Sequence, residues 1–434
     1  MRAVLRSERA AQPPLSPGLA GRLATASESG LDAAALIFFP LLVLAPRGVA
    51  ALTSVAGLLA LCLLAASGET ARLRSRLRSR LRSLAAPAAL IGSLLVWGAV
   101  SAAWSLDPPR SLELAARLAG LSAAGLVLAA AAGSLAAPRR LSLLSGVGLV
   151  IGLAMAITDF ATHGAVSGPF SSRAYQPARL NQATVGFAIL LAPASALLAC
   201  LDRKISSALL ALAAVASVCV LAGTAAKTAL AFALPMAVVV YALRAWAIPV
   251  AASISVLIVV TAPLTFARLE RLPAFTQTAD TIKQSFGHRL LIWSFAGDRI
   301  DEHPLAGWGL DASRAMPGGS EPIEPGETWL PLHPHNAPLQ VWLELGVPGA
   351  VLFALLAAVP WLALAAAEWP ALFAAAAGAA LTAGFVACLG TYGIWQEWWQ
   401  GTLWFSLFLV LVLGRAATAA DRGASPSPNR FGGE

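Results

Sequence analysis

The stretch GVPGAVLFALLAAVPWLALAA, residues 346–366, contains no charged residue and no Ser, Thr, Asn or Gln. At about 1.5 Å per residue, a helix of this length covers about 30 Å, the thickness of a bilayer's hydrocarbon core. Similar stretches recur along the chain and predict about twelve transmembrane helices, near residues 31–46, 48–66, 87–103, 112–132, 141–160, 180–200, 205–222, 228–243, 247–264, 346–366, 371–390 and 399–414. The sequence therefore predicts an all-α polytopic membrane protein.

Composition supports this fold class and excludes others. The 434 residues are 58% hydrophobic and 12% charged, whereas a soluble domain is about 25% charged. The apolar stretches are rich in Ala and Leu and do not alternate with polar residues, which indicates helices and not barrel strands. No cleavable signal pattern precedes the first stretch near Leu31. The net charge of +8 lies mostly between the stretches, where it contacts membrane lipids, so we expect no nucleic-acid partner.

The placement of Lys and Arg predicts the orientation. Cytoplasmic loops carry an excess of these residues, and with twelve spans the basic residues of alternate loops fall on one side. This predicts a cytoplasmic N-terminal arm (1–30), helices 1–9 (31–264), a large periplasmic loop (265–345), helices 10–12 (346–414) and a disordered cytoplasmic tail (415–434). The span at 228–243 is short, and without it every later loop changes side.

The long loop is the one segment that breaks the pattern of short connections. Loops of this length are either functional or disordered. This one contains Trp293, Trp308 and Trp329, and its apolar residues between about 278 and 300 follow helical spacing. We therefore expect a folded, partly helical loop that caps the outer end of the bundle.

The end of this loop carries the most informative motif, HPHNAPLQVWLELGVPG, residues 333–349. An imidazole accepts a proton near neutral pH, so His335 is a candidate base for a sugar hydroxyl, and His333 a candidate assistant. Alternatively, the histidines cap a helix or bind lipid phosphate. Asn336 either orients His335 or caps the following helix. Gly346 and Gly349 are predicted to shape the helix start and to permit close packing.

This motif resembles the signature of the O-antigen ligase family, which shares a domain with the Wzy-type O-antigen polymerases. The similarity rests on His335-Asn336 followed by Gly346 and Gly349, on RLLIW at 289–293, on HPLAGWG at 303–309, and on the twelve-span layout. The sharp motifs occupy about residues 285–350.

The resemblance implies a metal-independent glycosyltransferase without cofactor. Its donor would be a glycan on undecaprenyl diphosphate, and its acceptor lipid A-core or another glycan, at the periplasmic face of a bacterial inner membrane. A periplasmic histidine, here His335, would activate the acceptor hydroxyl. Arginines would hold the departing diphosphate, and the candidates here are Arg179, Lys227 and Arg289. Family members usually have arginine where this chain has Lys227, which keeps the charge but loses the bidentate fork.

Other functions remain open at the level of sequence. Ligase and polymerase share their chemistry, and the spacing of the His-Asn motif favours a ligase. A transporter of lipid-linked sugars would place charges within its spans, whereas few charges besides Glu113 and Arg117 lie there. A membrane scaffold would not need the histidine and the cations. Each cation on its own could also be a membrane-surface anchor.

Overall fold

The computed structural model describes residues 18–67, 84–170, 175–201, 224–273, 284–324 and 327–424, with isolated positions 208, 211, 212, 215 and 275. This part of the chain confirms the all-α prediction, because its only strands form a two-stranded antiparallel sheet, β1 (Pro322–Glu324) and β2 (Glu327–Thr328). The α-helices are α2 (Leu19–Leu44), α3 (Gly48–Ser67), α5 (Ala85–Val100), α6 (Pro108–Ala132), α7 (Pro138–Ala161), α8 (Leu180–Cys200), α10 (Thr224–Thr265), α12 (Gln284–Glu302), α13 (Ala337–Ala366), α14 (Ala371–Cys388) and α15 (Glu397–Ala424). Short 3-10 helices are η1 (Ser101–Ala103), η2 (Gly168–Phe170), η3 (Pro177–Arg179), η4 (Phe266–Arg271) and η5 (Ala312–Ala315).

Ten helices in the described ranges are long and apolar enough to cross a membrane, so the chain is a polytopic membrane protein. The difference between ten observed helices and twelve predicted spans has two causes. The span at 205–222 lies mostly outside the described residues. The spans at 228–243 and 247–264 are both contained in α10.

Helix α10 is two helices that meet at Leu243, whose φ of −131° and ψ of 35° are not helical. The guanidinium of Arg244, directly after this bend, donates to the carbonyls of Leu364, Ala367 and Trp369 at the end of α13. Near the start of α13, the indole of Trp342 donates to the carbonyl of Val259 at 2.8 Å. The second half of α10 therefore runs antiparallel to α13, and two separate spans are present, as predicted.

Three predicted boundaries are wrong. Helix α2 begins at Leu19, inside the predicted N-terminal arm, and α13 begins at Ala337, inside the predicted loop. The predicted disordered tail begins at 415, but α15 continues to Ala424 because residues 416–420 are Ala and Thr, which extend a helix. Residues 425–434 lie outside the described part of the chain.

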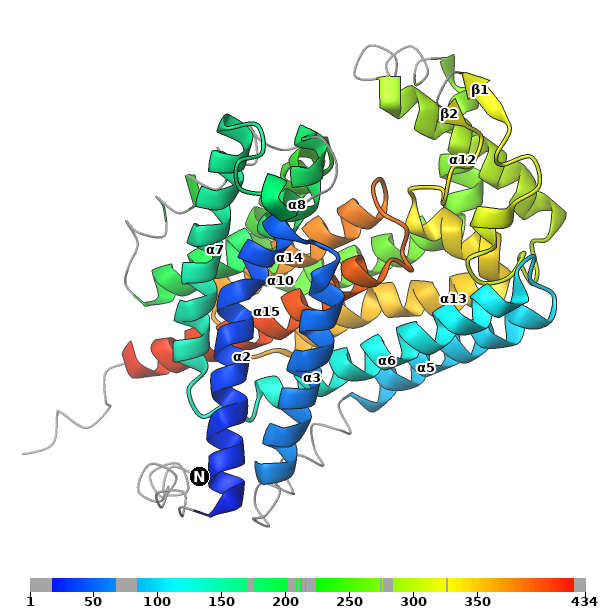
Figure 1. The fold of residues 1–434 in the computed structure, drawn as a ribbon. Coiled ribbons are helices and arrows are strands. Elements are labelled where there is room, and N and C mark those ends of the chain that lie inside the picture. The colour runs from blue at the N-terminus through cyan, green and yellow to red at the C-terminus, as the bar shows by residue number, and fades with distance from the viewer. Residues whose placement is uncertain are drawn as a thin grey trace, which may run out of the picture.

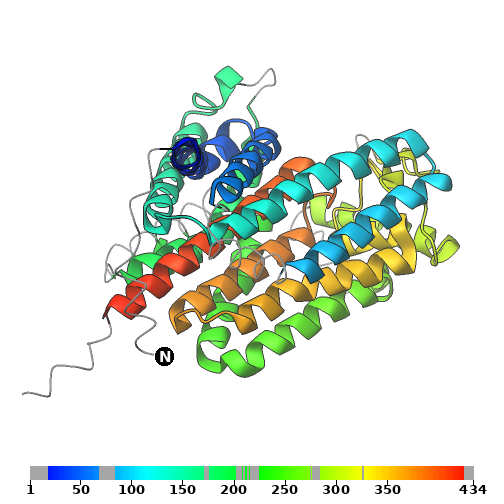
Figure 2. The ribbon, with the colours of Figure 1, turned by 90° about the horizontal axis from the view of Figure 1, so that it is seen from below.

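The helices form two differently oriented groups (Figures 1 and 2). Helices α5, α6, α13 and α15 run roughly side by side, whereas α2 and α3 cross them. Close contacts between helices occur at glycines, as expected where no hydrophobic force drives helices together within lipid. A side chain at Gly148 of α7 would meet the carbonyl of Leu36 in α2, and one at Gly125 of α6 would meet the Trp404 ring in α15.

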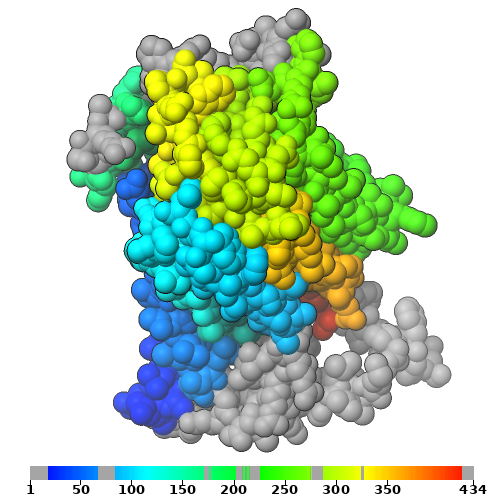
Figure 3. All heavy atoms as spheres, turned by 90° about the vertical axis from the view of Figure 1, so that its right-hand side faces the viewer, coloured from blue at the N-terminus to red at the C-terminus, as the bar shows by residue number. Residues whose placement is uncertain are grey.

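The long loop between α10 and α13 is folded and partly helical, as predicted. Its elements α12, η5 and the small sheet lie beside the ends of α5 and α6, which face the viewer in Figure 3. It has its own apolar core, in which Trp293 and Ile300 of α12 pack with Leu339 and Leu343 of α13. The loop is thus fixed to the start of α13, where the histidine motif lies. We call the end of the bundle at which α13 begins and α14 ends the motif end.

Candidate functional site

His335 has a defined tautomer. Its Nδ1 lies 2.6 Å from the carbonyl oxygen of Thr391, just after α14. Because a carbonyl can only accept, Nδ1 must carry the hydrogen. The other ring nitrogen, Nε2, is left with a lone pair and can accept a proton. His335 also has a left-handed backbone, with φ of +56°, which is uncommon outside glycine and marks a constrained position.

His335 is neutral at physiological pH. Burial above all, together with the positive charge of Arg289, lowers its pKa from the ordinary value of 6.5 to about 4, against the raising effect of the Thr391 hydrogen bond. A neutral imidazole with a free lone pair is the state that a general base requires.

His333 supports His335 from within the protein. It is 4% exposed, and its ring lies edge to face with that of His335 at 4.3 Å. Its Nδ1 faces the backbone N–H of His335 at 3.1 Å, and its Nε2 faces the N–H of Gly393 at 3.2 Å. Burial lowers the pKa of His333 to about 3, so its ring stays neutral. Only the ring nitrogen without a hydrogen accepts from one of these two N–H groups.

Asn336 caps α13. Its side-chain oxygen accepts from the N–H of Leu339 at 3.0 Å, and its amide nitrogen donates to the carbonyl of Leu389 at 3.0 Å. The first bond satisfies an otherwise unpaired N–H at the helix start. The second ties the start of α13 to the end of α14. Asn336 thus holds the backbone next to His335 in place.

Gly346 lies at a bend between two helical segments of α13, so a helical segment starts there as well as at Ala337. Its φ is +60°, and a side chain there would meet the carbonyl of Leu305 at 2.5 Å. The bend leaves the carbonyls of residues 343–345 without helical partners. The N–H groups of Trp308 and Gly309 and the indole of Trp97 bind these carbonyls. The HPLAGWG segment therefore docks on this bend. At Gly349 a side chain would meet Leu345 of its own helix at 2.2 Å.

Glu344 joins three segments around the histidines. Its fully buried carboxyl group accepts from the Asp311 N–H at 2.7 Å, the Ser313 hydroxyl at 2.5 Å, the Gln340 amide at 3.1 Å and the Trp395 indole at 2.6 Å. Such a network fixes a unique arrangement, since every lost bond would leave a buried donor unsatisfied.

Arg289 lies beside the histidines. Burial lowers its pKa, and the nearby Tyr392 raises it. Tyr392 follows Thr391 in the chain, and its buried hydroxyl has no hydrogen-bond partner among the described residues. Of the three predicted diphosphate-binding cations, Arg289 is the one whose charge acts on His335.

Arg179 and Lys227 lie at the motif end of neighbouring helices. Val240 of α10 contacts Gly378 of α14. Lys227 lies about 20 Å from Val240 along α10, and Thr391 lies about 20 Å from Gly378 along α14 and its extension. Lys227 and Thr391 therefore lie at one level of the bundle. Ile189 of α8 contacts Gly384, which places Arg179 at the same end. Lys227 is exposed, and Nη1 of Arg179 is buried without a hydrogen bond in the described part of the chain. Within the described part of the chain, no hydrogen bond joins either cation to the His335 ring, whose hydrogen bond goes to the Thr391 carbonyl.

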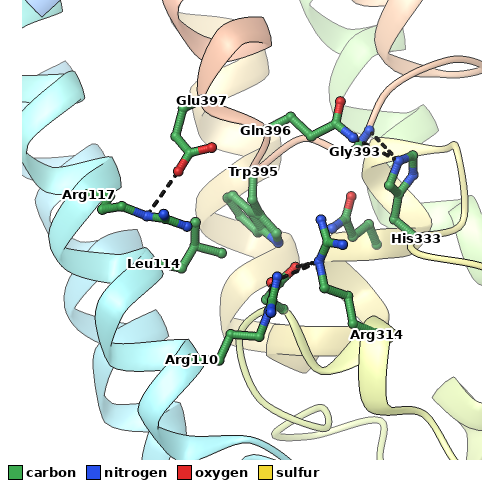
Figure 4. A pocket seen from close by; sticks show the side chains of 11 residues that line it. Arg110, Leu114, Arg117, Arg314, His333, Gly393, Trp395, Gln396 and Glu397 are labelled. Carbon is green, nitrogen blue, oxygen red and sulfur yellow. Dashed lines mark hydrogen bonds and ion pairs between the residues drawn. The ribbon is translucent and has the colours of Figure 1, made fainter. Parts of the chain in front are cut away.

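A polar pocket lies on the other side of His333 (Figure 4). Arg110 and Arg117 of α6 and Arg314 of η5 extend into it, and Glu397 and Gln396 complete its wall. Arg110 and Arg314 both contact Asp311, at 2.5 and 3.1 Å, and Arg117 contacts Glu397 at 2.9 Å.

Sequence reasoning missed several of these residues. Thr391 acts through its backbone, which leaves no sequence signal. Arg110 and Arg314 are far apart in sequence, and only the docking of the HPLAGWG segment on α13 brings them together. Glu344 offered a signal, because a carboxyl group inside an apolar helix needs buried donors.

Residues 209–354 match the family described as O-antigen ligase. Similar curated proteins, each named as a "Putative polysaccharide ligase", come from Rickettsia conorii (strain ATCC VR-613 / Malish 7), Rickettsia felis (strain ATCC VR-1525 / URRWXCal2) and Rickettsia bellii (strain RML369-C); they are 36%, 34% and 33% identical. The alignments cover 30%, 30% and 33% of this chain and 32%, 33% and 36% of the relatives, so the chain spans about a third of each relative's length. No solved structure matches. The segment that carries Arg289 and His335 therefore matches the O-antigen ligase family, as its motifs predicted.

Proposed function

We propose that the protein transfers a glycan from undecaprenyl diphosphate to an acceptor hydroxyl at the periplasmic face of the bacterial inner membrane. Lipid A-core is the acceptor, so the reaction is O-antigen ligation. The observation that carries this proposal is the state of His335: a neutral imidazole with a free Nε2, next to Arg289, at one end of a membrane helix bundle.

The reaction is a displacement at the anomeric carbon of the donor glycan. The acceptor oxygen attacks this carbon while Nε2 of His335 takes the hydroxyl proton. The bond between the anomeric carbon and the phosphate oxygen breaks, and its electron pair leaves with undecaprenyl diphosphate. The Thr391 carbonyl, bonded to Nδ1, stabilises the imidazolium that forms.

The cations at the motif end stabilise the leaving diphosphate. Arg289 and Arg179 offer forked guanidinium donors, and Lys227 adds a point charge. Such fixed donors stabilise charge that grows on the phosphate oxygens, so the proposed reaction requires no metal ion.

An apolar groove supports a lipid-linked donor. It is lined by Ala and Leu side chains of α8, α10 and α14, together with Ala211 and Val215, and has a volume of about 420 Å³. The helices α8 and α10 that form its walls carry Arg179 and Lys227 at their motif ends. An isoprenoid tail in this groove would direct its diphosphate toward both cations.

The test is a transfer assay with the full chain in lipid nanodiscs. Its substrates are a glycan on undecaprenyl diphosphate and lipopolysaccharide that lacks this glycan. We expect His335→Ala to abolish transfer and His163→Ala, which changes an exposed histidine after α7, to retain it. Full activity of His335→Ala would exclude His335 as the base. Elongation of lipid-linked glycan in place of capped lipopolysaccharide would indicate a polymerase.

A further inference from the structure

The pocket beside His333, here called the arginine pocket, has unused hydrogen-bond donors. Arg110 and Arg314 both bind Asp311 through Nε, and their terminal nitrogens make no hydrogen bond to the described residues. Figure 4 shows both guanidinium groups reaching toward the space between Trp395 and His333. Terminal guanidinium nitrogens held in this way form a ready fork for a phosphate or carboxylate.

The two guanidinium groups are held in place before any ligand binds. Asp311, 7% exposed, lies between them, and its own N–H is bound by Glu344 at 2.7 Å. Asp311 has a left-handed backbone with φ of +60°, so the Glu344 bond keeps it in a strained position. An anion entering the pocket would therefore meet donors whose orientation is already fixed.

The charge of the pocket favours an anion. Arg117 pairs with two carboxylates, Glu397 at 2.9 Å and Glu113 at 3.2 Å. Arg110 and Arg314 share the single carboxylate of Asp311, so the excess positive charge lies on these two arginines. The cavity volume is about 50 Å³, more than the roughly 10–15 Å³ that one water molecule needs by the same measure. This space suits a small anionic group such as a phosphate or a carboxylate.

The arginine pocket and the proposed donor site lie on different sides of the histidine pair. The charge of Arg314 acts on His333, whereas the charge of Arg289 acts on both His333 and His335. The separation lies in the elements that supply the charges. The pocket is built by α6, η5 and the segment before α15, and the donor cations come from η3, α10 and α12. An anionic group in the arginine pocket would thus be separated from the diphosphate but still adjacent to the base.

We propose that the arginine pocket binds an anionic group of the acceptor, a phosphate or a carboxylate, and so holds the acceptor's hydroxyl against His335. This inference rests on the proposed function. The pocket is a binding site and not part of the proton transfer, so its loss weakens acceptor binding while the chemical step continues.

The test compares the kinetics of wild type with those of Arg314→Gln and Arg110→Gln, using the full chain in nanodiscs. We expect each variant to raise the acceptor KM at least tenfold, to change kcat less than twofold and to leave the donor KM unchanged. Arg268→Gln is the matched control, because Arg268 binds Asp301 and Asp298 in the same loop region but not in the pocket. Thermal unfolding of each variant verifies that it folds. If a variant does not fold, Arg314→Lys is measured in its place, and we expect a smaller increase in its acceptor KM.

Chemically altered acceptors identify the group that binds. Wild type should lose affinity for acceptor treated with phosphatase, or for acceptor with reduced carboxyl groups, whereas Arg314→Gln should show no further loss. Inorganic phosphate should compete with acceptor in wild type but not in Arg314→Gln, at constant ionic strength. A raised donor KM, an unchanged acceptor KM, or a loss confined to kcat would each overturn the inference. The proposed function fails separately, if wild type transfers no glycan or His335→Ala remains active.

Discussion

The protonation of His335 gives a quantitative pH prediction. If the free enzyme needs neutral His335, the acid limb of kcat/KM should fall near its pKa of about 4. At pH 5.5 a group with this pKa is about 97% neutral, whereas an unperturbed histidine of pKa 6.5 would be about 9% neutral. The enzyme should therefore retain almost all its kcat/KM at pH 5.5.

The same structure predicts a different limb for kcat. Burial comes first among the causes of the low pKa of His335, and the charge of Arg289 adds to it. A bound diphosphate neutralises Arg289, so the pKa of His335 rises in the substrate complex. The acid limb of kcat, which reports that complex, should lie at higher pH than the limb of kcat/KM. Arg289→Gln should move the limb of kcat/KM upward, because the variant lacks the charge.

Stability must be followed in the same experiment. The folded pKa of His335 lies below its unfolded value, so the folded state binds fewer protons and stability falls as pH decreases from about 6.5 toward 4. At pH 5.5 this loss is about 1.4 kcal/mol. Rates are therefore measured with the full chain in nanodiscs, and thermal unfolding is recorded at each pH. An acid limb of kcat/KM near pH 6.5, with the protein still folded, would refute this account of the base.

Four further outcomes are expected. Glu344→Gln should destabilise the protein by about 2–3 kcal/mol in thermal unfolding, because an amide presents hydrogens to buried donors. Asn336→Ala should cost about 1–2 kcal/mol by the same measurement, since it removes the cap of α13. Arg289→Lys should lower kcat/KM about tenfold or more, a loss of about 1.4 kcal/mol from the missing fork. Excess EDTA should leave the rate unchanged, since cationic side chains stabilise the diphosphate in the proposed mechanism.

Each of these has a contrary result. If Glu344→Gln unfolds at the same temperature as wild type, the four hydrogen bonds of Glu344 do not stabilise the fold. Unchanged thermal stability of Asn336→Ala would mean that Asn336 does not stabilise the junction between the start of α13 and the end of α14. Equal activity of Arg289→Lys would make Arg289 a simple anchor. Loss of activity in EDTA, restored by a divalent ion, would contradict the metal-free mechanism.

The sequence predicted the membrane fold because apolar length is a local property. Residues 346–366 and their counterparts need no knowledge of their neighbours to be recognised as spans. The predicted helix boundaries were less accurate where one residue type can have two structural roles. Gly346 followed by Pro348 reads as a helix start, and a helical segment of α13 does start there, but the structure has a further helical segment before it, which Asn336 begins.

The candidate site was predictable only in part. His335 and Arg289 carry recognisable motifs, and the structure brings their charges together. The partner of His335, by contrast, is the backbone of Thr391, and any residue type could supply that carbonyl. The arginine pocket depends on Asp311 being held by Glu344, a contact set by the docking of one loop on a bend in α13, and no local pattern records it.

The most direct test of the central claim is a structure of the full chain with undecaprenyl-diphosphate-linked glycan and acceptor bound, captured with His335→Gln to prevent turnover. The account predicts the acceptor hydroxyl within hydrogen-bond distance of the residue 335 side chain, about 3 Å, and the diphosphate on Arg289. A diphosphate bound at the opposite end of the bundle, or an acceptor hydroxyl out of reach of residue 335, would contradict it.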